Sequence, residues 1–179
     1  ISMTDGQIYL SSDLFYEGIK PAIDVGLSVS RIGNKVQPPL FRWVSGSLRL
    51  ELLQSQELQR LSRFSAVSSQ NMVQRQRRGV ILRRLMSQPM HQPSSLADQS
   101  LLFYALKTGW LERLTEEGLR VCLSGLSERL PTFAQEAIRE QQPVPPTLQA
   151  QLDTALEDIL RPYAQPEGPA HAATAIPAR

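Results

Sequence analysis

The sequence predicts a mainly α protein, in which a short α/β segment leads into an all-helical bundle. Two observations predict this class. Short apolar pieces separated by Gly, Ser and Asp fill the first 37 residues, whereas after residue 39 apolar residues recur every three or four positions. The change falls at Pro38-Pro39, which removes two backbone donors and favours an extended chain. With 179 residues, 41% of them apolar, the chain is long enough for one core of ordinary size.

One short helix is predicted near the N-terminus, over 12–16. Ser11 or Ser12 can cap its first turn, because a serine hydroxyl accepts a hydrogen bond from a free backbone N–H there. Gly18 is the predicted stop, since glycine readily adopts the left-handed conformation that ends many helices.

A strand is predicted over 25–30, where apolar and small polar residues alternate with period two. This pattern suits a strand buried on one face, and it places Arg31 at the strand's end. The opening residues ISMTDGQIYL resemble the end of another strand that enters a turn at 4–6. We therefore expect the chain to be a fragment of a longer protein.

After residue 39 the helical period predicts six helices. An apolar stripe that runs from Phe41 to Phe64 predicts one long helix. The other five are predicted over 70–86, 96–107, 115–128, 131–141 and 147–161. The predicted core residues are Phe41, Leu48, Leu61, Leu82, Leu102, Phe103, Leu123, Phe133, Leu152 and Leu156. The Pro- and Ala-rich stretch after Tyr163 lacks an apolar period and is predicted to be disordered. The predicted domains are 1–37, 38–163 and a tail over 164–179.

Composition and charge exclude several classes of protein. A formal net charge of +2 is too close to balance for a chain that binds polyanions along its whole length. The single Cys122 cannot close an internal disulfide, and His91 and His171 lie far from it, so no metal site is predicted. No apolar run approaches the roughly 20 residues of a membrane-spanning helix. We expect a soluble chain from a reducing compartment.

Three ordered blocks in the first 33 residues carry the most specific signal. They read ISMTDGQ at 1–7, DLFYEGIKPA at 13–22 and VGLSVSRIG at 25–33. A weaker set follows at 44–52, 56–58 and 88–93. Together these blocks closely resemble the α subunit of F-type ATP synthase. The resemblance covers about the first 110 residues well and the remainder by helical pattern alone.

The resemblance implies that 1–37 are the end of a P-loop nucleotide-binding domain and that the C-terminal helical domain follows. It implies a regulatory, non-catalytic subunit of the F1 sector that alternates with β subunits in a hexamer around a central shaft, the γ subunit, with a peripheral stalk outside. Such a complex couples ATP synthesis or hydrolysis to proton or sodium transport. We therefore expect a peripheral membrane complex on the cytoplasmic face of a bacterial inner membrane, or on the matrix or stroma side in an organelle.

Arg31 matches the arginine finger of this family, which reaches across the subunit interface to the γ-phosphate held by the neighbouring β subunit. Phosphoryl transfer spreads negative charge over equatorial oxygens, and the planar guanidinium stabilises that charge better than a mobile ammonium. Ser2 matches the family's serine at the same interface, where a hydroxyl can donate a hydrogen bond near the phosphate. The resemblance thus implies two site residues, Arg31 and Ser2, that serve a catalytic site on another chain.

A second, non-catalytic nucleotide site is implied within the α subunit itself, for ATP or ADP with Mg²⁺ in the full-length complex. Its adenine pocket corresponds to Phe15, Lys20, Gln88 and Met90. The family usually has Arg at the second position and Gln at the last. Lys20 keeps the charge but lacks the stacking plane of arginine, and Met90 lacks an amide that could bind the base. These residues either form the pocket or pack the loop before Pro93.

The loop that follows the first long helix also departs from the family's pattern. The loop after the first long helix reads Ser65-Ala-Val-Ser-Ser69, whereas family members usually carry acidic residues there that meet the basic central shaft. Losing both acids weakens electrostatic complementarity more than packing. The chain is then either a divergent paralogue, for example of an accessory sodium-transporting ATPase, or a diverged housekeeping or naturally split subunit.

The main alternative is a nucleic-acid-binding helical module. The stretch from Leu58 to Ala97 holds seven arginines and no acidic residue, which is typical of a helix that lies on phosphates. The near-zero net charge, the scarcity of interleaved aromatic residues and the resemblance of 1–33 all favour the ATP synthase subunit.

One prediction follows directly from the sequence. The 179 residues contain no G-x-x-x-x-G-K-[ST] motif, so the loop that cradles the phosphates of ATP is missing from them. We expect this chain alone to be inactive and to bind no cofactor, and calorimetry with Mg-ATP should give no heat of binding. A saturable isotherm at micromolar ATP would contradict this interpretation.

Overall fold

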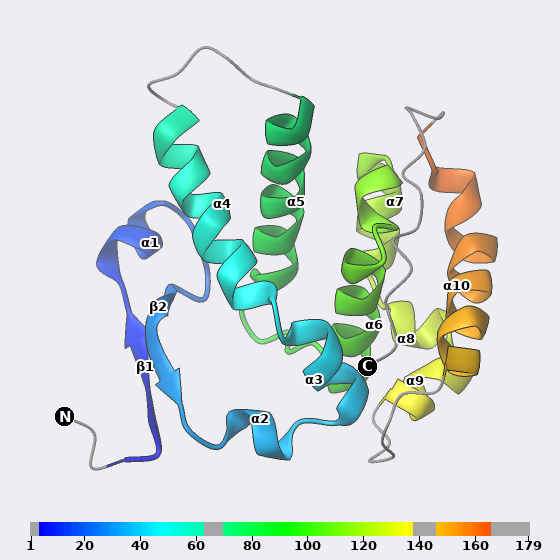
Figure 1. The fold of residues 1–179 in the computed structure, drawn as a ribbon, viewed down its shortest axis with the longest axis horizontal. Coiled ribbons are helices and arrows are strands. Elements are labelled where there is room, and N and C mark those ends of the chain that lie inside the picture. Colours follow the sequence, from blue (N-terminus) through cyan, green and yellow to red (C-terminus); the bar gives the residue numbers. More distant parts are fainter. Residues whose placement is uncertain (1–3, 63–69, 138–145, 166–179) are drawn as a thin grey trace.

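The computed structural model describes residues 4–62, 70–137 and 146–165. A β-hairpin lies beside two long antiparallel helices, α4 (Leu48–Ser62) and α5 (Gln70–Met86), and a cluster of further helices packs on their other side (Figure 1). The predicted mainly α fold with a short α/β segment is confirmed. One hydrophobic core, built from residues of the helices, runs through the helical part.

The hairpin pairs β1 (Gly6–Leu10) with β2 (Ile23–Ser30) in antiparallel register, from Gly6 opposite Ser30 to Leu10 opposite Ile23. The register is irregular in the middle, where side chains replace ladder hydrogen bonds. Tyr9 N–H donates to Ser28 Oγ at 2.9 Å, and Leu27 N–H donates to Asp24 Oδ1 at 3.0 Å. The predicted strand is confirmed, and it starts two residues earlier than the alternation indicates.

Between the strands, α1 (Ser12–Tyr16) has the predicted bounds. Ser11 is its N-cap, and the Ser11 hydroxyl accepts from Leu14 N–H at 3.4 Å. Gly18 has a φ of 80°, so the predicted glycine stop is also confirmed. A further short helix that the sequence did not predict, α2 (Gly33–Val36), follows β2.

The single long helix predicted after residue 39 is wrong. The chain instead forms α3 (Pro39–Ser45), turns at Gly46 and Ser47, and starts α4 at Leu48. Ser47 fixes the restart, because its hydroxyl donates to the Glu51 carboxylate at 2.7 Å and its C=O accepts from Glu51 N–H at 3.0 Å. The apolar stripe continues across the break because α3 and α4 face the same core.

The remaining elements are α6 (Leu96–Lys107), η1 (Leu111–Arg113), α7 (Glu116–Leu123), α8 (Leu126–Arg129), α9 (Pro131–Ala137), α10 (Pro146–Leu160) and η2 (Arg161–Tyr163). The helices predicted over 70–86, 96–107 and 147–161 are confirmed to within one residue. The helix predicted over 115–128 is two helices, because Gly125 adopts a φ of 126° that breaks the run. The end of the helix predicted over 131–141 lies outside the described residues.

Most predicted core residues are buried or half-buried. Leu48, Leu82, Leu102, Leu152 and Leu156 belong to the buried core, and Phe41 packs on Phe103 with ring centroids 5.8 Å apart. Leu123 is 36% exposed and was wrongly predicted, since the buried face of α7 runs through Leu119 and Cys122 and the next residue points away from it. The side chain of Leu61 lies outside the described residues.

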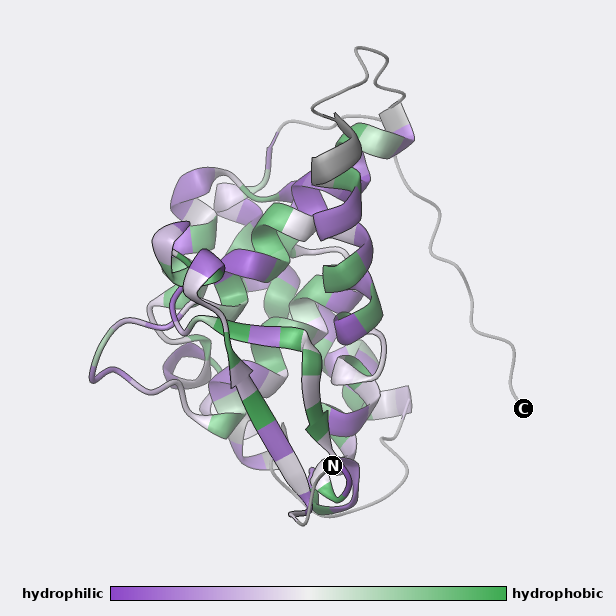
Figure 2. Cartoon of the chain, turned by 90° about the vertical axis from the view of Figure 1, so that its left-hand side faces the viewer, coloured by the Kyte–Doolittle hydropathy of each residue, from purple (hydrophilic) through white to green (hydrophobic). Residues whose placement is uncertain are grey.

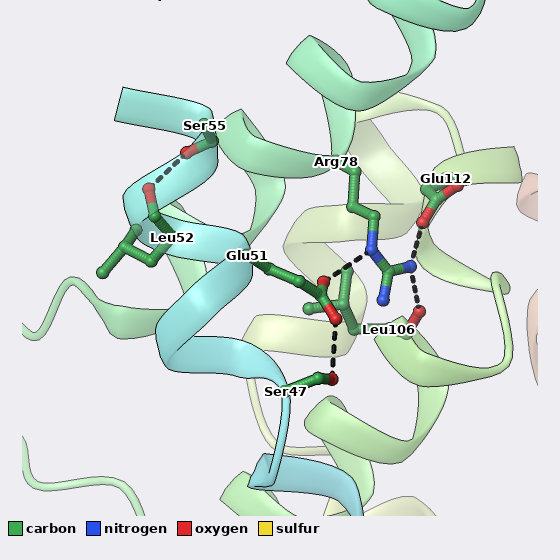
Figure 3. Close-up of polar contacts among 7 residues, drawn as sticks. All are labelled: Ser47, Glu51, Leu52, Ser55, Arg78, Leu106 and Glu112. Carbon is green, nitrogen blue, oxygen red and sulfur yellow. Dashed lines mark hydrogen bonds and ion pairs between the residues drawn. The ribbon is translucent and has the colours of Figure 1, made fainter. Parts of the chain in front are cut away.

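One guanidinium joins four elements of the helical part. Arg78 of α5 donates from Nε to Glu51 of α4 at 2.8 Å, and from Nη1 to Glu112 of η1 and to the Leu106 carbonyl of α6, the latter at 2.7 Å (Figure 3). The side chains of Arg78, Glu51 and Glu112 are only 26–29% exposed. Burial alone raises the pKa of Glu51, but hydrogen bonds from Arg78 and Ser47 and the nearby positive charges outweigh it and lower that pKa.

Next to Arg78, α4 and α5 approach closely. A Cβ built on Gly79 would lie 2.4 Å from Ser55 Cβ, which no pair of side chains tolerates. Ser55 is 7% exposed, and its hydroxyl donates to the Leu52 carbonyl of its own helix at 3.0 Å. The two small residues therefore set the distance between the helices.

The ion-paired cluster predicts a pH-dependent stability. The pKa of Glu51 is lowered in the folded state, so its contribution is present above the unfolded pKa of about 4.5 and is lost as pH falls through the folded value. Glu51→Gln should lower the free energy of unfolding by about 2 kcal/mol at pH 7 and by progressively less as pH falls below 4.5. Urea unfolding at several pH values measures this, with the exposed Glu157→Gln on α10 as a control. A penalty that does not change with pH would contradict the assignment.

The close crossing predicts an unusual sign for a glycine substitution. At an open helix position Gly→Ala stabilises by about 1 kcal/mol, whereas Gly79→Ala should destabilise by about 1–2 kcal/mol because the methyl group meets Ser55. Ser55→Gly should recover most of that loss in the double variant. Gly46→Ala is the control, since no atom lies nearer than 3.4 Å to a Cβ there. Stabilisation by Gly79→Ala would show that the helices are less close than described.

Candidate functional site

Arg31 lies at the end of β2, in a turn whose backbone is held from two sides. Arg31 N–H donates to the Asp5 carbonyl at 2.9 Å, which ties the turn to the start of β1. The Ser30 hydroxyl accepts from Gly33 N–H at 3.0 Å, and a Cβ on Gly33 would lie 2.8 Å from that hydroxyl. Arg31 is therefore mounted on a turn that is held by hydrogen bonds on both sides of it.

The Arg31 side chain itself is exposed. In the part of the chain that the structure describes, it makes no hydrogen bond or ion pair. Because the backbone of Arg31 is held in place and its guanidinium has five donors, the side chain can bind a carboxylate or a phosphate group of another molecule. The sequence analysis did not identify Asp5 or Ser30 as supports for Arg31, although the three-residue spacing from Ser30 to Gly33 is typical of a side-chain cap.

Large apolar side chains are exposed along the hairpin that carries this turn and just after it. Figure 2 shows hydrophobic segments along both strands of the hairpin. The exposed residues include Ile8 at 72%, Leu10 at 71%, Leu27 at 56%, Val29 at 50% and Val36 at 75%. An apolar surface of this kind is typical of a protein contact, because single soluble domains rarely expose so many neighbouring apolar groups.

At the opposite end of β2, the structure brings three of the four predicted pocket residues together. The Lys20 ammonium lies 5.3 Å from the centre of the Phe15 ring, and the Lys20 carbonyl accepts from Gln88 N–H at 2.9 Å. The Ser87 hydroxyl donates to the same carbonyl at 3.1 Å. These hydrogen bonds join the chain just after α5 to the hairpin. They place the Lys20 ammonium and the exposed Phe15 ring near Gln88.

The other predicted site residues are placed differently. Met90 lies in the turn after Gln88, and its side chain is 83% exposed. Ser2 and the loop over 65–69 lie outside the described residues. Ser87 was not predicted, and nothing in its sequence context distinguishes it from other loop serines.

The hairpin is also connected to α4. Arg49 donates to the Gly26 carbonyl at 2.8 Å, and Val25 packs on the edge of the helical core. Arg49 therefore holds the irregular middle of β2 against the helices, between the Arg31 turn at one end and Lys20 at the other.

The described residues offer neither a metal cluster nor a membrane-spanning helix. Within the described ranges, no three side chains of His, Cys, Asp or Glu gather closely enough to hold a metal ion. None of the helices described is both long and apolar enough to cross a membrane.

The thiol of Cys122 is buried. Burial raises its pKa to about 11, because this effect is larger than the opposite effect of the nearby positive charge of Arg129. The thiol is therefore a poor nucleophile at neutral pH.

These features define a helical domain that is attached to a hairpin with an exposed arginine. A protein-family model described as "ATP synthase alpha/beta chain, C terminal domain" matches residues 37–159, which is more than half of the chain. The chain belongs to this family, as the resemblance of its first blocks predicted. The match starts next to Pro38, and membership implies a subunit of an ATP synthase or ATPase complex with alternating subunits.

Proposed function

We propose that the chain is the non-catalytic, regulatory α-type subunit of the F1 sector of a rotary ATP synthase or ATPase. The observation that carries this proposal is Arg31, exposed and without a partner among the described residues, on a turn fixed by Asp5 and Ser30. The exposed apolar surface of the hairpin supports a protein neighbour beside that turn. The family match supports a complex in which alternating subunits supply that neighbour.

In this proposal Arg31 acts on a nucleotide bound to the adjacent β subunit. As the bond to the γ-phosphoryl group breaks, negative charge spreads over its equatorial oxygens. The guanidinium donates two parallel hydrogen bonds to those oxygens, because its planar fork of donors matches their spacing. The fixed turn matters because an arginine held in place loses little entropy on reaching the transition state. Ser2 would donate a hydrogen bond at the same interface.

We also propose that Phe15, Lys20 and Gln88, with Met90, take part in a second nucleotide site that holds ATP or ADP with Mg²⁺ in the full-length complex. The exposed ring of Phe15 offers a stacking surface for a base, and the Lys20 ammonium lies 5.3 Å from the centre of that ring. In this chain the role of these residues is to bind and orient the base.

The proposed partners are β subunits, the γ subunit of the central shaft and a peripheral stalk, in a complex that couples ATP chemistry to proton or sodium transport. The proposed location is the cytoplasmic face of a bacterial inner membrane, or the matrix or stroma side in an organelle. Nucleic-acid binding is less well supported, because two arginines of the basic stretch already pair with carboxylates. Arg78 pairs with Glu51 and Glu112, and Arg84 pairs with Glu116.

The Arg31 assignment predicts a loss of turnover with little change in binding. In the full-length subunit assembled with β, Arg31→Lys should lower steady-state ATP hydrolysis by about 10³-fold, by comparison with arginine fingers generally. Nucleotide affinity of the β site should change far less. Lys35→Gln is the matched control, since it removes an exposed cation four residues away. Hydrolysis by Arg31→Lys within about threefold of the parent would show that the finger assignment is wrong.

A further inference from the structure

A shallow groove of about 340 Å³ is lined by residues of α5 and α7. Figure 1 shows that α4 lies between these two helices and the hairpin. Its apolar lining comes from Val73, Val80 and Ile81 of α5 and from Leu119 of α7. Val73 and Val80 are 52% and 51% exposed, although both belong to the apolar lining. The two half-exposed valines lie on the same side of α5 and form an apolar surface. Burying that surface under another molecule is favourable, because apolar area is then removed from water.

The spacing of the two valines fits a helical occupant. They are seven residues apart, which is two helical turns or about 10.5 Å along α5. A helix that lies beside α5 presents apolar side chains at the same interval, at positions i, i+3 or i+4, and i+7. The groove between two helices therefore matches one apolar face of a third.

The charged residues along the groove indicate which side chains a docked helix should carry beside its apolar face. Arg77 lies between the two valines, and it donates only to neutral acceptors, at 2.8 Å to the Leu114 carbonyl and at 3.2 Å to Gln165 Oε1. Among the described residues it has no carboxylate partner. Arg84 at the far end is already paired with Glu116 at 2.6 Å. A half-buried guanidinium beside an apolar surface is stabilised by an incoming carboxylate, because both its charge and its free donors are then satisfied.

We propose that the groove between α5 and α7 docks an acidic amphipathic helix of a partner protein. The apolar face of that helix covers Val73 and Val80 next to the buried Leu119, and a carboxylate on its edge pairs with Arg77. A nucleic acid fits this surface less well, since the floor is apolar and Arg84 is neutralised by Glu116. The docking surface goes beyond the proposed subunit function, because it involves neither Arg31 nor the residues around Lys20.

The test uses the full 179-residue chain and fluorescence anisotropy of a labelled helical peptide of Leu, Ala and Glu, with Leu at every third or fourth position. We expect saturable binding, and weaker or no binding of the same peptide with Lys in place of Glu. Arg77→Gln and Val80→Asp should each weaken binding about tenfold, the former because one charge-assisted hydrogen bond is lost. Circular dichroism checks that both variants remain folded.

Matched controls separate this site from general attraction. Arg75→Gln removes the same charge from an exposed position of α5, and Leu50→Asp introduces an acid at a site on α4 that is 60% exposed, so each should change binding by less than about twofold. Equal losses from Arg75→Gln and Arg77→Gln, or the absence of saturable binding, would overturn the proposal.

The other possible occupants give distinct results, each of which would also overturn it. If a chain that ends at Gln165 binds the peptide about tenfold more tightly, residues after Gln165 are the natural occupant. Sedimentation that shows a dimer dissociated by Val80→Asp would assign the groove to a second copy. Random duplex DNA whose binding falls with Arg77→Gln but not with Val80→Asp would assign it to nucleic acid.

Discussion

The ion-paired contact of Arg78 is the interaction on which the arrangement of the helices depends. An arginine remains charged at every pH at which the protein folds, so a half-buried guanidinium needs acceptors on several sides. Glu51, Glu112 and the Leu106 carbonyl supply them from three other elements (Figure 3). Removing one acceptor leaves the charge partly unpaired, which costs more than the lost contact. The positions of α4, α6 and η1 are therefore linked through one side chain of α5.

This contact requires the close approach of Ser55 and Gly79. Ser55 is one helical turn beyond Glu51, and Gly79 directly follows Arg78, so the steric contact and the ion pair join the same two helices at neighbouring positions. The position of the hairpin depends in turn on α4 and α5. Arg49 reaches the Gly26 carbonyl from α4, and Gln88 reaches the Lys20 carbonyl from the end of α5. The Arg31 turn is thus positioned by helices that are distant from it in the sequence.

Local signals in the sequence predicted much of this fold, and their failures have a common cause. The Ser11 cap, the Gly18 stop and the bounds of α5 and α6 depend on residues within a few positions, and each prediction is confirmed. Apolar periodicity reports which face is buried, but it does not report whether the helix is continuous. It therefore merged α3 with α4, and α7 with α8, because both members of each pair face one core. Arg78 could not be predicted as a shared contact, since seven arginines in that stretch look alike in sequence.

In the candidate site, too, features set by neighbouring residues could be predicted from the sequence, whereas contacts between distant segments could not. Periodicity placed Arg31 at a strand end, but the carbonyl that holds it belongs to Asp5, directly before the other strand of the hairpin. Only the family resemblance connected Phe15 and Lys20 with Gln88, since these contacts form between segments far apart in the chain. A pair of strands without further neighbours would not fix such a turn, because a two-stranded hairpin is marginally stable in water. The contacts from Arg49 and Gln88 supply the missing constraint, so the rigidity of the Arg31 turn originates in the helical domain.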